Sequence, residues 1–220
     1  FQDQFAAAQV KAVALAGKFK GELIENHSIT LFSITEGAFQ IQTLARFTPK
    51  GTIHIGVVDP GVGSTRSGIV IKTAKDWFIG PDNGLLYPAA FSQDIKAIWK
   101  IDEKCFGRVS PTFHGRDVFI KAAVLLSHGK SPRQFGCTKI KALVKLQFQP
   151  GQILHIDSYG NAKTYGNGHL NLPQVKTFAD LSPGEAGQLW GSSDTWEIVV
   201  NQASAADKFG LILGQIVKNL

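Results

Sequence analysis

The sequence predicts an α/β domain followed by a small all-β domain. Strand-like and helix-like segments alternate up to Ser131-Pro132, a pattern typical of α/β layers. Beyond that point the segments are short and β-rich, and Gly and Pro turns separate them. The 220 residues, of which 44% are hydrophobic and 18% charged, suffice for one large globular domain or two small ones. We therefore expect the domain boundary between about Ser131 and Lys145.

The elements of the first domain follow from apolar periodicity and turn residues. Residues 4–18 place apolar side chains on one helical face and close on Gly17, which predicts a helix with a glycine stop. Residues 53–58 form an apolar run typical of a buried strand. The other expected elements are helices over 35–47 and 117–128 and strands over 68–73, 77–80 and 95–101.

The second domain is expected to contain only strands. Its segments are short and β-rich, and Gly and Pro turns separate them. The expected strands cover residues 145–149, 152–157, 169–172 and 195–200.

Composition argues against several classes of protein. No apolar run approaches the roughly 18–20 residues of a membrane helix, and no signal peptide is visible. Cys105 and Cys137 form neither a disulfide framework nor a metal spacing, which predicts free thiols in a cytoplasmic setting. The net charge of +6 suits an anionic partner, but the lysines are scattered and lack interleaved aromatic residues. We expect neither a nucleic-acid nor a membrane partner, and no metal.

The most informative segment follows the apolar run at 53–58. The strand ends at Asp59, and the Pro- and Gly-rich turn after it brings Arg66 back seven residues later. Ligands bind at the carboxyl ends of strands in open α/β sheets, and a buried charged pair there is costly unless chemistry uses it. A tight turn closed by a surface Asp–Arg salt bridge explains the same residues, so this segment alone leaves both interpretations open.

Two further turns of the first domain carry candidate residues. Thr112 is placed to cap the helix at 117–128, and His114 beside it can act as an acid or base near neutral pH. A solvent-facing residue near the cap is the alternative for this histidine. Asp82 and Asn83 follow a strand and can present polar groups to a nucleoside, although Pro-Asp-Asn-Gly is also an ordinary turn.

One turn of the second domain has a similar character. Asp157 stands at a strand end, and Tyr159 and Asn161 follow it. Tyr can stack on adenine and Asn can match its donor–acceptor edge. A hairpin turn accounts for the same residues.

Taken together, four segments resemble one family. They are Val58–Arg66, Pro81–Leu86, Thr112–Asp117 and Asp157–Asn161. In this order they resemble the S-adenosyl-L-methionine (SAM) hydroxide adenosyltransferases, the adenosine-forming SAM hydrolases related to SAM-dependent fluorinases and chlorinases. The resemblance covers nearly the whole chain. It implies an α/β sandwich domain over residues 1–135 and a small barrel-like β domain over 146–220.

The resemblance also implies the reaction. We expect hydrolysis of SAM to adenosine and L-methionine by an activated water that attacks the ribose C5′, with no cofactor, since SAM is the substrate. Asp59, Arg66 and His114 match the catalytic set of the family. The halogenating relatives replace the Asp and the His, so their presence here favours water over halide as the nucleophile. A SAM-dependent halogenase and a SAM- or adenosine-binding protein without turnover are the alternatives.

Further residues match substrate contacts of the family. The resemblance implies an aromatic ring at Phe32 over the ribose, adenine contacts at Tyr159, Asn161 and Phe178, and a methionine-amine contact at Asp157. It places Ser192 and Ser193 at the methionine carboxylate and Asn201 in a segment beside the adenine. It includes Asp82 and Asn83 among the substrate contacts, because they lie in one of the four matching motifs, Pro81–Leu86. It further implies a homotrimer with sites between subunits.

The chain departs from the family pattern at a few positions. Gln2 replaces a usual glycine, Tyr165 stands where Asn is common, and the Ser192-Ser193 segment lacks an arginine. The opening strand that ends in Thr-Asp-Phe-Gly in the family, whose Asp holds the ribose hydroxyls, does not occur in this sequence. These departures bear on affinity and on the exact substrate.

Overall fold

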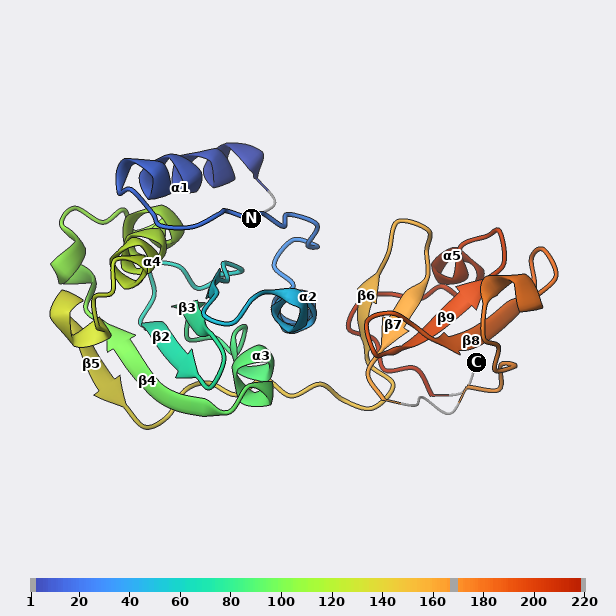
Figure 1. Cartoon of the computed structure of the whole chain (residues 1–220). Coiled ribbons are helices and arrows are strands. Elements are labelled where there is room, and N and C mark those ends of the chain that lie inside the picture. Colours follow the sequence, from blue (N-terminus) through green and yellow to red (C-terminus); the bar gives the residue numbers. More distant parts are fainter. Residues whose placement is uncertain (1–2, 167–169, 219–220) are drawn as a thin grey trace. The chain divides into compact units, whose positions relative to one another are not determined.

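The computed structural model describes residues 3–166 and 170–218 of the chain (Figure 1). Two compact units divide the chain, Phe1–Leu146 and Gln147–Leu220. Among the described residues, no helix is long and apolar enough to cross a membrane. The departure at Gln2 and the first residue of the strand expected at 169–172 lie outside the described residues.

The first unit is built on a mixed five-stranded sheet in the order β1-β3-β2-β4-β5. Only the β1–β3 pair is parallel among these neighbours, and the other three pairs are antiparallel. The strands are β1 (Ile53–Ile55), β2 (Gly68–Thr73), β3 (Trp77–Pro81), β4 (Ile95–Ile101) and β5 (Cys137–Ile140). The apolar run at 53–58 is therefore strand only in its first half, and its second half leads into the loop that carries Asp59.

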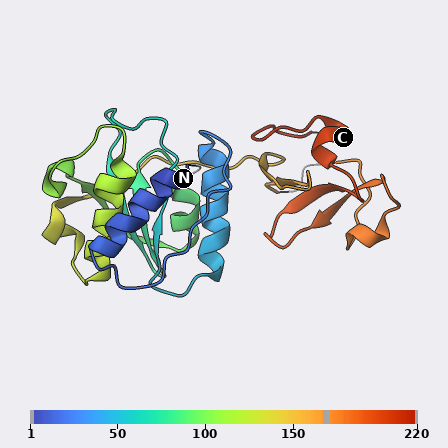
Figure 2. The same cartoon turned by 90° about the horizontal axis from the view of Figure 1, so that it is seen from above.

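Helices cover this sheet, as expected for an α/β domain. They are α1 (Gln4–Ala16), α2 (Ile34–Phe47), α3 (Tyr87–Ser92) and α4 (Ile120–Ser127). Figure 2 shows α1 lying across α4, and the two pack over one face of the sheet around a shared apolar core. Asp3 caps α1 and Ser33 caps α2 through side-chain oxygens that accept backbone N–H groups.

The helix expected over 117–128 begins differently from the prediction. A π-helical turn, Gly115–Phe119, precedes α4, and the N–H of Ile120 donates to the carbonyl of Gly115, five residues back. Thr112 does not cap this segment, because its hydroxyl lies 3.2 Å from Ser110 Oγ instead. The N–H of Ser110 is bound by Asp117 Oδ2 at 2.8 Å. Single π turns inside helices are frequent at functional sites.

The first unit extends further than the domain expected over 1–135. Strand β5 pairs with β4 from Ile98–Ile140 to Ile101–Cys137, so these residues complete the first sheet. The segment at 145–149, expected as a strand, contains no strand. Periodicity over so short a segment does not separate a strand from an extended connection.

The second unit contains a four-stranded antiparallel sheet in the order β6-β7-β9-β8. The strands are β6 (Ile153–Ile156), β7 (Ala162–Thr164), β8 (Ala186–Trp190) and β9 (Trp196–Val200), and a short helix, α5 (Ala205–Phe209), follows them. Ile153, Ile198 and Ala205 belong to its buried core. The mixed α/β unit followed by a small antiparallel unit confirms the predicted fold class. The described part of 169–172 is not a strand, and the helix α5 was not foreseen.

Candidate active site

The loop after β1 is shaped so that Asp59 and Arg66 turn toward each other. Carbonyls of Asp59 and Gly61 accept the N–H groups of Val62 and Ser64, which folds the loop into successive tight turns. Gly63 has φ +77°, and a Cβ built there would lie 2.6 Å from the carbonyl oxygen of Pro111. Glycine therefore allows this loop to approach the segment that leads to His114.

The structure brings the three predicted catalytic side chains together. Arg66 donates from Nε to Asp59 Oδ1 at 3.0 Å and from Nη2 to Asp59 Oδ2 at 2.5 Å. The same Nη2 lies 2.8 Å from Nδ1 of His114. The side chains of Asp59, Arg66 and His114 are 5%, 9% and 6% exposed. A surface salt bridge, the alternative interpretation of this loop, does not fit such burial.

An aromatic ring forms the apolar side of this cluster. The guanidinium carbon of Arg66 lies 5.6 Å from the centre of the Phe119 ring, within the range of a cation–π contact. The His114 and Phe119 rings meet edge to face at 6.4 Å and 82°. Because Phe119 is fully buried, the charged pair lies where water screens it poorly.

Glu103 is a fourth member of the cluster that the sequence analysis missed. It lies in a 3₁₀ turn, Glu103–Phe106, and its Oε1 is 3.2 Å from His114 Nδ1 and 3.8 Å from Arg66 Nη1. The register between strands β2 and β4 is the feature that places Glu103 beside Arg66. Strand β4 runs antiparallel to β2, with Ile69 opposite Lys100, so the end of β4 meets the start of β2 just after Arg66.

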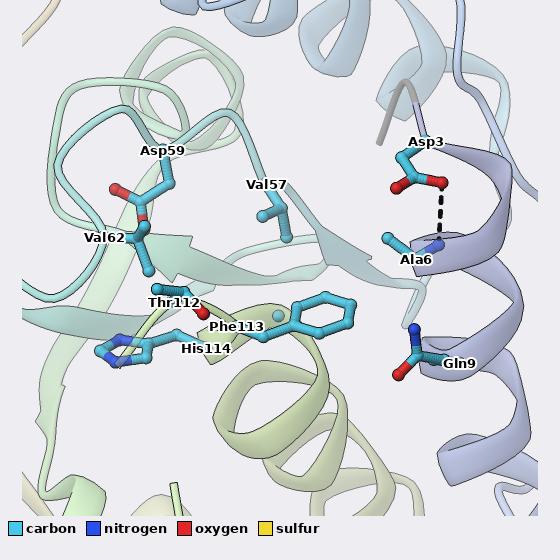
Figure 3. Close-up of a pocket in the computed structure, with 10 residues that line it drawn as sticks. Asp3, Ala6, Gln9, Val57, Asp59, Val62, Thr112, Phe113 and His114 are labelled. Atoms are coloured by element: carbon cyan, nitrogen blue, oxygen red, sulfur yellow. Dashed lines mark hydrogen bonds between the residues drawn. The ribbon is translucent and has the colours of Figure 1, made fainter. Parts of the chain in front are cut away.

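A pocket of about 380 Å³ opens beside Asp59 and His114. Figure 3 shows these two side chains on one side of the pocket and helix α1 on the opposite side, with the Phe113 ring between them. Asp3, Ala6 and Gln9 of α1 line that opposite wall. Asp3 is held by its capping bonds to the N–H groups of Phe5 and Ala6, the second of which is drawn in Figure 3.

Three predicted substrate contacts of the first unit are not among the described residues that line this pocket: Phe32, Asp82 and Asn83. Asn83 donates from Nδ2 to the carbonyl of Val58 at 2.8 Å and so holds the chain just before Asp59. Asp82 Oδ1 accepts the N–H of Val144 at 2.8 Å. Burial raises the pKa of Asp82 above its ordinary value, and the bond from Val144 opposes this shift. Both residues therefore tie this turn to segments far from it in sequence.

Phe32 has an unusual backbone conformation. Its φ is +63°, and its side chain is 72% exposed. A bulky residue with positive φ is rare, and such strain is often found at ligand sites. An exposed ring in a strained turn is available to a ligand.

In the second unit, the Asp157–Asn161 segment forms the loop of the β6–β7 hairpin. Asp157 Oδ1 accepts the N–H groups of Tyr159 and Asn161, both at 3.0 Å, and its Oδ2 accepts Asn161 Nδ2 at 3.1 Å. Asn161 is buried, whereas the Tyr159 side chain is 78% exposed. The carboxylate and the amide thus build the hairpin, and the Tyr159 ring stays open to a ligand.

The remaining predicted contacts lie at two ends of the second sheet. Asn201 follows β9 and donates from Nδ2 to the carbonyl of Leu181 at 2.7 Å, and the N–H of Leu181 binds the carbonyl of Phe178. Ser192 and Ser193 lie in the turn between β8 and β9, next to the Trp190–Trp196 pair. The structure brings Phe178 and Asn201 to one end of the β8–β9 hairpin and the two serines to the other.

Comparison with known proteins agrees with both units. The SAM hydroxide adenosyltransferase N-terminal domain matches residues 2–136, and the corresponding C-terminal domain matches residues 151–218. An (R)-S-adenosyl-L-methionine hydrolase from Methanocaldococcus jannaschii is 37% identical over 142 residues, which span 63% of this chain and 51% of that protein. The chain thus matches about half the length of this relative. A Thermus thermophilus protein of the same name is 28% identical over 246 residues, covering 100% of this chain and 95% of the relative.

A solved structure has the same fold. An uncharacterized conserved protein from Thermotoga maritima superposes with a TM-score of 0.85 at 25% identity, covering 95% of this chain and 93% of that one. The domain matches span both units of the chain and include all four segments that suggested the family. The chain therefore belongs to the SAM hydroxide adenosyltransferase family.

Proposed function

We propose that this chain is an enzyme that hydrolyses SAM to adenosine and L-methionine. The observation that carries the proposal is the buried Asp59–Arg66–His114 cluster beside a pocket, in a chain whose two units both match the family. Relatives from several organisms are named (R)-SAM hydrolases, which supports the (R) epimer at sulfur as the substrate.

The reaction is an in-line displacement at the ribose C5′. A water oxygen forms the new C5′–O bond while the C5′–S bond breaks. The electron pair of the C5′–S bond goes to the sulfonium sulfur. Methionine leaves as a neutral thioether, and one proton of the water goes to the enzyme and then to solvent. Because the leaving group is already good, the protein mainly positions and activates one water.

His114 is the proton acceptor in this proposal, and Asp59 has an orienting role. Both Asp59 oxygens already accept a hydrogen bond from Arg66, whereas the described contacts of His114 with Arg66 and Glu103 use Nδ1 alone. That leaves Nε2 to meet a molecule in the pocket. The Asp59 charge also offsets repulsion between the Arg66 guanidinium and the sulfonium of the substrate.

Several finer features belong to the same proposal. The exposed rings of Tyr159 and Phe178 stack on the adenine, and the active form is a homotrimer in which different subunits share a site. No cofactor takes part. The enzyme acts in the cytoplasm, where a reducing environment keeps thiols such as those of Cys105 and Cys137 free.

A product assay tests the proposal. The purified chain is incubated with each sulfur epimer of SAM, with and without chloride, fluoride or EDTA, and the nucleosides are identified by mass spectrometry. We expect adenosine from the (R) epimer in every buffer. A 5′-halo-5′-deoxyadenosine would instead identify a halogenase, and binding without any product would identify a SAM-binding protein.

A further inference from the structure

Glu103 contacts two members of the catalytic cluster. Its Oε1 lies 3.2 Å from His114 Nδ1 and 3.8 Å from Arg66 Nη1. Arg66 Nη1 is buried and has no hydrogen-bond partner among the described residues. The Glu103 side chain is 35% exposed, so it retains freedom to move that Arg66 and His114 lack. A partly exposed carboxylate therefore stands against a buried guanidinium–imidazole pair.

Arg66 and Glu103 make opposite demands on the same ring nitrogen. A guanidinium only donates hydrogen bonds, so the 2.8 Å contact with Arg66 Nη2 requires a lone pair on Nδ1 of His114. An ionised carboxylate only accepts, so the 3.2 Å contact with Glu103 requires a proton on Nδ1. The two contacts cannot both be hydrogen bonds at one moment. Each favours a different tautomer of the ring.

The tautomer decides whether His114 can act as a base. With Arg66 as the partner, the proton of the neutral ring sits on Nε2, and the nitrogen that remains for the pocket can only donate. With Glu103 as the partner, the proton sits on Nδ1, and Nε2 has a lone pair that can take a proton from water. After that transfer both nitrogens carry protons, and Nδ1–H then needs an acceptor that Arg66 cannot be.

We infer that Glu103 is a positioning residue that holds a proton on Nδ1 of His114 and so makes Nε2 the base of the reaction. This inference rests on the proposed hydrolysis. When His114 accepts the water proton at Nε2, Glu103 accepts the hydrogen bond from Nδ1–H and stabilises the imidazolium. A carboxylate has this role toward the histidine of Ser-His-Asp triads.

A pair of substitutions separates the charge of Glu103 from its shape. Glu103→Gln keeps the length of the side chain, but its amide N–H₂ can donate to Nδ1 and favour the tautomer without a base at Nε2. Glu103→Asp keeps the carboxylate and shortens the side chain, which its partial exposure tolerates. We expect Glu103→Gln to lower kcat by about 10²-fold with little change in KM, and Glu103→Asp to retain more activity. Higher activity in Glu103→Gln than in Glu103→Asp would mean that shape matters and would overturn the inference.

Glu22→Gln is the matched control. Glu22 is exposed. Two residues earlier, the backbone N–H of Lys20 donates to Ser127 Oγ, at the end of α4 that lies far from His114. The same change of charge there should leave kcat at the wild-type value. A loss equal to that in Glu103→Gln would show a general effect of charge and contradict the role of Glu103.

Nitrogen-15 spectra of the histidine rings test the tautomer directly and need no substrate. The His114 signals are assigned by their absence in His114→Ala, and spectra are recorded in alkaline buffer, where neutral tautomers are compared. We expect a clear Nδ1–H population in the wild type and a shift to Nε2–H in Glu103→Gln. Identical tautomers in both proteins would refute the inference, whereas a wild type that releases no adenosine would refute the proposed function instead.

Discussion

His114 and Asp59 make different contributions to the same cluster, although each is nearly buried. Asp59 neutralises Arg66 through two hydrogen bonds, so its removal leaves the nearly buried guanidinium with only the longer, 3.8 Å ion pair to Glu103 in this cluster. Losing one partner of a buried ion pair typically costs about 3–5 kcal/mol of stability. His114 does not neutralise a buried charge, so its removal mainly takes away a proton acceptor.

Replacement of these two residues should therefore separate catalysis from stability. We expect His114→Ala and Asp59→Ala each to lower kcat by about 10²-fold or more while SAM still binds. Only Asp59→Ala should also lower the melting temperature strongly. Stopped assays, calorimetric binding and thermal melts measure the three effects. Near-wild-type kcat in either variant would remove that residue from the catalytic set.

Arg66 tests whether charge or geometry matters at this position. Arg66 holds Asp59 with Nε and Nη2 and reaches His114 with the same Nη2, a pattern that a lysine ammonium cannot reproduce. We expect Arg66→Lys to lose most of the activity and to behave like Arg66→Ala. Arg133→Lys, an exposed site, is the control. If Arg66→Lys kept more than about half of wild-type kcat, a barrier change of only ~0.4 kcal/mol, charge alone would suffice.

Asp82 gives a prediction on pH and stability. Burial raises its pKa, so the folded state disfavours the charged carboxylate. At low pH Asp82 is protonated and its burial does not lower the free energy of unfolding. The destabilisation appears as the pH rises above ~4, the ordinary pKa of an aspartate, because the buried carboxyl then has to ionise. Asp82→Asn keeps an oxygen to accept the N–H of Val144 but removes the charge. We expect it to raise the melting temperature at pH ~7 and to have little effect at pH ~3. An equal gain at both pH values would contradict this explanation.

At the scale of elements, sequence patterns predicted the longer helices and strands. They missed the elements and contacts that depend on pairing between segments far apart in sequence. The bounds of β2 and β4 match the prediction because their apolar runs end at clear turn residues. Strand β5 was missed because it is short, only Cys137 in it is buried, and its strand conformation depends on pairing with β4, which lies far from it in sequence. Glu103 was missed for the same reason, since only the register of β2 and β4 brings it to Arg66. The Asp59–Arg66–His114 set could be predicted because Asp59 and Arg66 share one motif, Val58–Arg66, and His114 lies in another, Thr112–Asp117.

The contact between two loops gives a prediction at this scale. At Gly63, an added Cβ meets the carbonyl oxygen of Pro111 at 2.6 Å and also has an unfavourable φ of +77°. Gly129 has a nearly equal φ of +78° but open space around its Cβ position. We expect Gly63→Ala to lose more stability than Gly129→Ala and to lower kcat, because it pushes the Asp59 loop away from His114. Thermal melts and product assays are run on both variants. Gly129→Ala shows the effect of backbone strain alone, and Gly63→Ala shows the effect of the same strain together with the steric clash against Pro111. Equal effects of the two substitutions would show that the loop contact is unimportant.

At the scale of the whole molecule, the proposed site draws on both units of the chain. Asp59, Arg66 and His114 belong to the first unit, while the rings of Tyr159 and Phe178 belong to the second. In the proposed trimer, each site combines the first unit of one subunit with the second unit of another. Such sharing makes activity depend on assembly, which a mixture of two inactive variants can reveal.

The two variants are His114→Ala and the double variant Tyr159→Ala/Phe178→Ala, which removes two exposed rings and leaves the hydrogen bonds of the Asp157 hairpin in place. After unfolding and refolding as an equal mixture, half of the first units and half of the second units are intact. Random assembly then forms a fully intact site in about one quarter of cases, so we expect about one quarter of wild-type activity. Each variant refolded alone is the control and should stay inactive. If every site were instead built within a single subunit, mixing would restore no activity, and a fully active monomer in light scattering would refute the trimer as well.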